Sequence, residues 1–113
     1  MYVNSPNGAV ILCIDDESGR IAGASIVQYE QLFQHERVGV IVKFYVRKSY
    51  RGMGKGRELL ESTVKWFDEK DCVFSEVVPT AGLDIDQLTI NLFKKFGYTN
   101  CAIALRRYHN GLS

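Results

Sequence analysis

The residues with the clearest chemical potential are clustered in one glycine-rich turn. In order they are Arg51, Gly52, Met53, Gly54, Lys55 and Gly56, which gives the spacing R-x-x-G-x-G. Because glycine lacks a side chain, backbone N–H groups in such a turn can converge on one ligand. The helix expected to follow adds further N–H groups and the positive end of its dipole. The turn is therefore predicted to bind an anion, and a pyrophosphate in particular.

An alternative is that the glycines only make a tight connection between a strand and a helix. Against this alternative, the glycines are interleaved with Arg51, Lys55 and Arg57. A cation in the first turn of a helix is normally unfavourable, and a bound anion would remove that penalty. The spacing is neither that of the Walker loop nor that of the dinucleotide fingerprint, so ATP and NAD are disfavoured.

Hydrophobic patterning predicts the elements that position this turn. Apolar runs at residues 9–14 and 21–29, with polar turn formers at residues 15–20 between them, predict a β-hairpin. A third strand is predicted at residues 38–46, where every even position is apolar, so one face of it should be buried. After the turn, apolar residues recur at helical spacing over residues 56–70.

The rest of the chain repeats the alternation of strand and helix. Residues 72–78 are predicted to form a strand parallel to the third one, because a helix connects the two. A second helix is predicted to begin at Asp84, which forms a capping box with Gln87, and to end at Gly97. Residues 98–108 alternate and are predicted to be the last strand.

These elements predict an α/β (α+β) fold, a mixed and mostly antiparallel sheet with two helices in the order β-β-β-α-β-α-β. The chain, residues 1–113, fits one domain. A net charge of +1 gives no general attraction to nucleic acid, and no apolar run is long enough to span a membrane. Its three cysteines are far apart in apolar runs, so free buried thiols are expected rather than a metal site, which favours a cytoplasmic protein.

At the glycine turn the sequence resembles the GNAT acetyltransferase superfamily. The family's acyl-CoA signature, Q/R-x-x-G-x-G/A after a strand ending L-x-V, is similar to residues 51–56 and to Phe44-Tyr45-Val46. The family's C-terminal element L-Y-x-K-x-G-F looks like residues 92–98, LFKKFGY. The resemblance extends over residues 9–108 and implies a GNAT-like fold with acetyl-CoA as co-substrate and no metal.

The resemblance also assigns roles to individual residues. The backbone N–H of Phe44 is expected to polarise the acetyl carbonyl, and that of Val46 to bind the pantetheine arm of CoA. Residues 51–56 are expected to hold the pyrophosphate. Phe93 stands where many family members have a tyrosine that protonates the departing thiolate, so Phe93 is expected beside the cofactor without a proton to give.

The general base and acid must then come from elsewhere. By strand parity Glu76 shares a face with Cys72 and Phe74, an odd place for a carboxylate unless it faces the cleft, so Glu76 is the candidate base. An open alternative is that Glu76 is a paired or edge-exposed charge. Tyr98 is the candidate acid, because it is the nearest phenol in sequence to the position of the missing tyrosine.

The sequence thus predicts an N-acetyltransferase that acts by direct transfer on a primary amine of a small molecule or peptide. The alternative is a catalytically weak or inactive GNAT-like binding or structural module. A nucleic-acid-binding domain is disfavoured, because exposed aromatic residues are not interleaved with the cations. The family's first strand and two helices are expected to be absent or reduced, since eight residues precede Ala9, and the sheet edge this uncovers predicts a homodimer.

Overall fold

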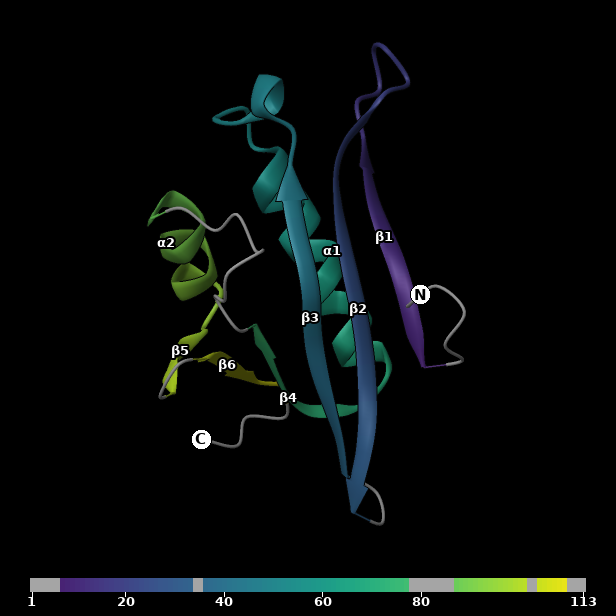
Figure 1. Ribbon diagram of the computed structural model, residues 1–113, viewed down its shortest axis with the longest axis vertical. Coiled ribbons are helices and arrows are strands. Elements are labelled where there is room, and N and C mark those ends of the chain that lie inside the picture. The colour runs from purple at the N-terminus through teal and green to yellow at the C-terminus, as the bar shows by residue number, and fades with distance from the viewer. Residues whose placement is uncertain (1–6, 34–35, 78–86, 102–103, 110–113) are drawn as a thin grey trace.

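In the described part of the chain, six strands form one sheet and two helices accompany it (Figure 1). The computed structural model describes residues 7–33, 36–77, 87–101 and 104–109. The elements in chain order are β1 (Gly8–Ile14), β2 (Ile21–Phe33), β3 (Glu36–Val46), the 3₁₀ turn η2 (Lys48–Tyr50), α1 (Lys55–Glu69), β4 (Cys72–Val77), α2 (Gln87–Lys95), β5 (Thr99–Cys101) and β6 (Ala104–Tyr108). Their order across the sheet is β1-β2-β3-β4-β6-β5. The β3–β4 pair is parallel and the other pairs are antiparallel, which confirms the predicted mixed, mostly antiparallel sheet with two helices.

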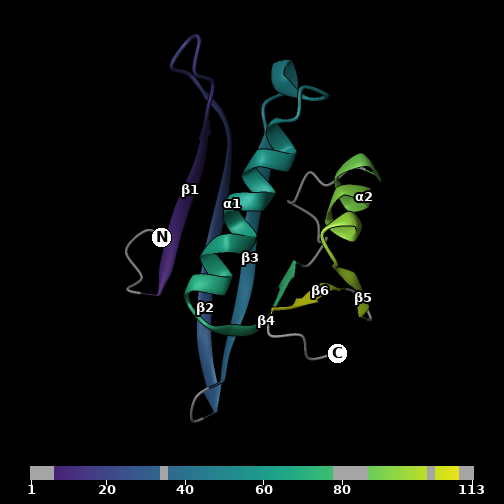
Figure 2. The ribbon, with the colours of Figure 1, turned by 180° about the vertical axis from the view of Figure 1, so that it is seen from behind.

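Helix α1 lies along one face of the sheet because its apolar residues form a single stripe. Figure 2 shows α1 in front of β2 and β3, with α2 at its side near β5 and β6. The buried residues of α1 are Leu59, Leu60, Thr63, Val64 and Phe67, which recur at intervals of three to four positions. The sheet accommodates this stripe at Gly39, where a Cβ atom would clash with the ring of Phe67.

The first hairpin has the predicted turn, but the second one is longer than predicted. Asp15 N–H donates to the Arg20 carbonyl at 2.8 Å, and Gly19 adopts a left-handed φ of 71°. The strands predicted at residues 21–29 and 38–46 both extend further toward each other, so that β2 runs to Phe33 and β3 begins at Glu36. The ladder between the two strands satisfies the backbone there, so the exposed side chains need no apolar alternation.

A bulge in β3 corrects the prediction that its even positions share one buried face. The β2–β3 register shifts between the pairs Ile26↔Lys43 and Val27↔Ile41, so Val42 has no direct partner. The extra residue reverses the alternation. Ile41 is buried before the bulge and Phe44 after it, whereas the side chain of Val42 is only partly buried.

The C-terminal strand is also different from the prediction. Residues 98–108 were expected to form one strand, but β5 and β6 are separate and pair with each other from Thr99↔Arg106 to Cys101↔Ala104. Strand β6 then pairs with β4, so this hairpin completes the sheet. At the end of α2, Gly97 has a φ of 93° and the Tyr98 N–H donates to the Phe93 carbonyl at 3.1 Å, as expected for a glycine that ends a helix. The predicted capping residue Asp84 lies outside the described residues.

The thiols of Cys13 and Cys72 are free and buried, as predicted. Burial raises the pKa of Cys72 to about 11. The side chain of Cys101 lies outside the described part of the chain. No helix in that part has the length and apolar character needed to cross a membrane. Its His, Cys, Asp and Glu side chains do not form a group of three that could hold a metal ion.

Candidate functional site

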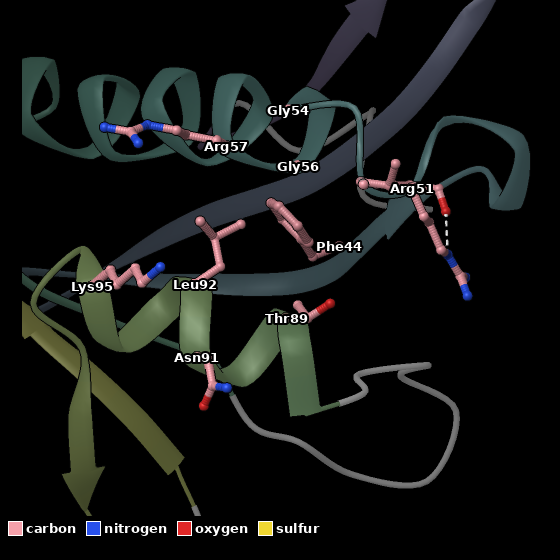
Figure 3. A pocket seen from close by; sticks show the side chains of 11 residues that line it. Phe44, Arg51, Gly54, Gly56, Arg57, Thr89, Asn91, Leu92 and Lys95 are labelled. Atoms are coloured by element: carbon pink, nitrogen blue, oxygen red, sulfur yellow. Dashed lines mark hydrogen bonds between the residues drawn. The ribbon is translucent and has the colours of Figure 1, made fainter.

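A cleft of about 550 Å³ opens between the end of β3, the glycine turn and α2 (Figure 3). Its lining from β3, the turn and α1 consists of Phe44, Val46, Arg51, Gly52, Gly54, Gly56 and Arg57. Its lining from α2 consists of Thr89, Asn91, Leu92 and Lys95. Six of the predicted cofactor-binding residues therefore meet at one cleft. Met53 and Lys55 lie in the same turn but do not line the cleft. Phe93 does not line the cleft either, and packs against Phe44, which does.

The turn has its shape because two glycines adopt a left-handed conformation. Gly52 has a φ of 81° and Gly54 a φ of 80°, a region that costs any other L-residue free energy. A Cβ atom would meet nothing within 4 Å at either position, so backbone conformation rather than lack of space requires glycine there.

Gly54 is also the N-cap of α1, which aims the helix at the cleft. The first intrahelical hydrogen bond runs from Glu58 N–H to the Gly54 carbonyl at 3.1 Å. The N–H groups of the three residues between them, Lys55, Gly56 and Arg57, consequently have no acceptor within the helix. Together with the helix dipole they make this end of α1 attractive to an anion.

The charged side chains that line the cleft are all cationic: Arg51, Arg57 and Lys95. Arg57 also pairs with Glu61 at 3.2 Å, but both side chains are exposed. The pair therefore contributes little free energy and does not prevent Arg57 from binding a ligand. Arg51 has a bracing role, because its Nε donates to the Val46 carbonyl at 3.1 Å (Figure 3) and its guanidinium lies 5.6 Å from the centre of the Tyr45 ring.

Tyr50 fixes the 3₁₀ turn against the first hairpin. Its hydroxyl donates to Oδ2 of Asp15 at 3.2 Å, and Ser18 Oγ donates to the same oxygen at 2.7 Å. The hydrogen bond from Ser18 holds the pKa of Asp15 below its ordinary value, with a smaller contribution from Tyr50. The segment that leads into the glycine turn is therefore held at both ends, by Asp15 and by the start of α1.

The backbone at the end of β3 presents two N–H groups on the side away from β2. Arg47 N–H donates to the Ala22 carbonyl at 2.7 Å, so it points toward β2. The register is regular from Phe44 to Val46, and successive N–H groups of a strand point to opposite sides. The N–H groups of Phe44 and Val46 therefore point away from β2.

On that side of β3 the neighbouring strand is β4, and its pairing ends before these residues. The last described pair between the two strands is Ile41↔Val77. The N–H groups of Phe44 and Val46 thus lie beyond the described end of the β3–β4 ladder, next to the cleft that both residues line. This is the position expected for donors that bind an extended ligand as an added strand.

A stack of aromatic rings forms the wall behind the cleft. Phe44 lines the cleft and packs edge-on against Phe93 at 5.1 Å, and Phe93 packs edge-on against Tyr98 at 5.2 Å. Phe93 and Tyr98 are both buried. Tyr98 shares a hydrogen bond with Ser75 at 2.8 Å, and burial raises its pKa to about 12. These features disfavour Tyr98 as a proton donor to a group in the cleft.

Glu76 lies on the other face of the sheet. The prediction that it shares a face with Cys72 is wrong, because the β3–β4 register skips Val73 and reverses the alternation in β4. Cys72, Ser75 and Val77 are buried toward the helices, whereas Glu76 is partly exposed beside Val40 and opposite Arg106 in the register. Glu76 does not line the cleft, and its role as a base stays a prediction.

Sequence reasoning did not assign the α2 residues of the cleft to the site. Thr89, Leu92 and Lys95 are spaced by three, so helical periodicity places them on one face of α2. The sequence gives no sign that this face lies opposite the glycine turn, since the contact between α1 and α2 is a tertiary one.

Comparison with known proteins identifies one family. A family model described as acetyltransferase (GNAT) family matches residues 2–98. The resemblance seen at the glycine turn is thereby confirmed. No curated protein sequence matches the chain.

Solved structures share the fold at low sequence identity. Arabidopsis thaliana NAA60 in complex with a bisubstrate analogue gives a TM-score of 0.77 at 15% identity, covering 97% of this chain and 80% of that one. The NatC complex bound to Gag peptide and CoA gives 0.73 at 16% identity, covering 86% and 69%. Glucosamine-6-phosphate N-acetyltransferase from Arabidopsis thaliana gives 0.69 at 22% identity, covering 86% and 63%. Likeness at these identities establishes the fold.

Proposed function

Because the chain belongs to the GNAT acetyltransferase family, whose model matches residues 2–98, we propose that it transfers an acetyl group from acetyl-CoA directly to a primary amine. One observation carries the proposal: the backbone of the glycine turn, the start of α1 and three cationic residues line one cleft. This combination suits the pyrophosphate of CoA, which carries charge and accepts several hydrogen bonds.

In the proposed reaction the amine nitrogen attacks the carbonyl carbon of the thioester. Negative charge develops on the carbonyl oxygen, which accepts a hydrogen bond from the N–H of Phe44. The N–H of Val46 binds the pantetheine arm and keeps it extended along β3. The tetrahedral intermediate then collapses, the C–S bond breaks and the CoA thiolate leaves. A single donor to such an oxyanion is worth about 10²–10³ in rate.

The departing thiolate takes its proton from water in this scheme. No phenol is among the described residues that line the cleft, and the resemblance implies that Phe93 stands where many family members have a tyrosine. A free thiol has a pKa near 8.5, so a CoA thiolate can leave at neutral pH without a dedicated acid. A general acid contributes about 10²–10⁴ in rate, and transfer is therefore expected to be slow.

The attacking amine must lose a proton, and Glu76 is the proposed base. It is a neighbour of Val40 in the register, four positions before Phe44, which is roughly 13 Å along an extended strand. That separation and the position of Glu76 on the other face of the sheet exclude direct transfer, so Glu76 would act through a chain of several ordered water molecules. Replacement by glutamine keeps the shape of the side chain and removes the charge, and should lower turnover without changing the affinity for CoA.

The acceptor is proposed to be a primary amine of a small molecule or peptide. Among the structural neighbours, one is bound to a Gag peptide and another is named for glucosamine-6-phosphate. A continuous assay of CoA release with polyamines, amino acids, aminoglycosides and lysine peptides tests the proposal. At least one amine should raise the rate above that of hydrolysis without amine. If acetyl-CoA fails to bind at all, the proposal is refuted.

Phe93→Tyr tests whether a missing acid limits the reaction. The new hydroxyl should raise turnover with the amine found in the screen at neutral pH, while the affinity for CoA changes little, because the ring keeps its place in the aromatic stack. Tyr98→Phe is the control, since it removes a neighbouring phenol whose hydroxyl is directed to Ser75. An unchanged rate for Phe93→Tyr together with a fast wild type would mean that another group supplies the proton.

A second candidate function is a CoA-binding module without catalysis. The buried, apolar Phe93 at the position of the acid favours it. The screen separates the two functions: tight binding of acetyl-CoA without acetyl transfer in either the wild type or Phe93→Tyr would make the module the better description.

A further inference from the structure

A chain of buried polar side chains lies at the opposite end of α1 from the glycine turn, and the proposed reaction does not use it. The hydroxyl of Tyr98 lies 2.8 Å from Oγ of Ser75, which in turn contacts Nε2 of His109. Nδ1 of His109 lies 2.8 Å from Oδ1 of Asp68, at the C-terminal end of α1. Four separate parts of the sequence meet in this network.

The order hydroxyl, imidazole and carboxylate is that of a nucleophilic triad, but burial excludes that role. Ser75 is 0% exposed and Tyr98 is 1% exposed, so no substrate can reach either hydroxyl. The side chain of His109 is equally buried, with only Asp68 reaching solvent. The network therefore acts on the protein itself rather than on a bound molecule.

His109 has two partners that make opposite demands on the same nitrogen. Arg107 Nη1 lies 2.7 Å from Nδ1 and can only donate, whereas ionised Asp68 at 2.8 Å can only accept. Nδ1 of the neutral ring can accept from Arg107 or donate to Asp68, but not both. In the protonated ring both nitrogens donate, which favours Asp68 and repels Arg107. Protonation thus selects one of two arrangements of this cluster.

His109 is the titratable side chain at the centre of this cluster. The pKa of His109 is lowered by its burial and then by Arg107, and Asp68 opposes both. Burial raises the pKa of Tyr98 to about 12 and that of Cys72, on β4 nearby, to about 11. An ordinary imidazole has a pKa of about 6.5, so we expect His109 to be the group that gains a positive charge as the pH falls below neutrality.

The same network continues to the cleft through the aromatic stack. Tyr98, which shares the hydrogen bond with Ser75, packs edge-on against Phe93 at 5.2 Å, and Phe93 against Phe44 at 5.1 Å. Phe44 lines the cleft. Because interiors are close-packed, a displaced hydroxyl moves the ring that carries it and the rings packed on that ring.

We propose that His109 is a positioning residue, which couples its own protonation to the affinity of the cleft for CoA through Ser75, Tyr98 and the aromatic stack. This proposal rests on the proposed CoA binding at the cleft. When His109 is neutral, the cleft keeps the shape that binds CoA. Protonation of His109 disturbs that shape and so weakens the binding of CoA. Acid conditions should therefore lower the affinity for CoA.

Calorimetric titration with dephospho-CoA between pH 7.5 and pH 5.5 tests the coupling. This ligand keeps the pyrophosphate but lacks the 3′-phosphate, whose second ionisation near pH 6 would add its own pH dependence. The affinity of the wild type should fall as the pH drops below about 6.5, by at most about 10-fold per pH unit because a single proton is involved. His109→Gln, which keeps a polar side chain but cannot be protonated, should show no such fall.

Two further variants locate the effect. His35→Gln removes the only other histidine and should behave like the wild type. Tyr98→Phe keeps the ring and removes the hydroxyl that joins the stack to Ser75, so the affinity of this variant for dephospho-CoA should lose the pH dependence while NMR still shows His109 titrating.

Wild-type binding that is the same at both pH values overturns the inference and leaves the proposed function intact. A Tyr98→Phe variant as pH-dependent as the wild type also overturns it. Absence of CoA binding at every pH overturns the proposed function instead.

Discussion

Replacement of Gly54 by alanine separates the binding role of the glycine turn from its structural role. Gly54 has a φ of 80°, and a Cβ atom there would meet nothing within 4 Å, so the expected penalty is backbone strain alone. A left-handed conformation costs an L-residue about 1–2 kcal/mol. For a domain of this size the melting temperature should fall by roughly 4–8 °C for each kcal/mol.

Gly19 in the first hairpin provides a matched control. Its φ is 71°, and its surroundings are equally open, so Gly19→Ala should lose stability by the same mechanism and to a similar extent. Gly19 does not line the cleft. A difference in ligand binding between the two variants therefore reports the cleft and not the general stability of the fold.

Binding of CoA should respond to Gly54→Ala alone. Relief of the strain would turn the N–H groups at the start of α1 away from the pyrophosphate. Loss of one charge-assisted hydrogen bond costs about 1.5–3 kcal/mol, which corresponds to a dissociation constant higher by roughly 10- to 150-fold. Calorimetric titration of the wild type and both variants at one salt concentration measures this directly.

Two results would refute this reasoning. Equal dissociation constants for all three proteins would mean that the turn does not hold the ligand. An equal loss of affinity in Gly19→Ala and Gly54→Ala would mean that binding follows stability and that the geometry of the turn has no special part in it. Thermal melting of the same samples shows whether the two variants are comparably folded.

Three further predictions concern the rest of the molecule. Gly39→Ala places a Cβ atom against the ring of Phe67 and should destabilise the fold by about 1–3 kcal/mol in urea denaturation, whereas alanine at Gly56, where a Cβ makes ordinary contacts, should not. The pKa of His109 is lower in the folded than in the unfolded protein, so the unfolded state takes up the proton first. The free energy of unfolding should therefore be unaffected by this group above about pH 6.5 and fall as the pH drops below it, and urea melts of His109→Gln should lack that component. Strand β1 pairs only with β2 among the described strands and exposes Val10, Leu12 and Ile14, so we expect self-association through this edge, and sedimentation should show more monomer for Leu12→Lys than for the wild type.

The sequence by itself determined most of the local elements and identified the turn that lines the cleft. The glycines at 52 and 54 and the glycine at 97 have the left-handed conformations that their turn and cap require, because the choice of glycine is a local matter of φ. The apolar stripe of α1 and the parallel β3–β4 pair also followed from periodicity and connectivity. Most residues of the glycine turn could therefore be placed in the cleft before the structure was known.

Tertiary structure alone decided which face each remaining side chain occupies. The bulges at Val42 in β3 and Val73 in β4 arise from pairing with other strands and leave no mark on the local pattern, yet each reverses the alternation beyond it. That reversal puts Glu76 on the face away from the cleft. In the same way, Lys95 lines the cleft because α2 packs beside α1. His109 meets Asp68, 41 positions away, through the path of the last hairpin, and a local reading of the chain cannot supply a contact of that range.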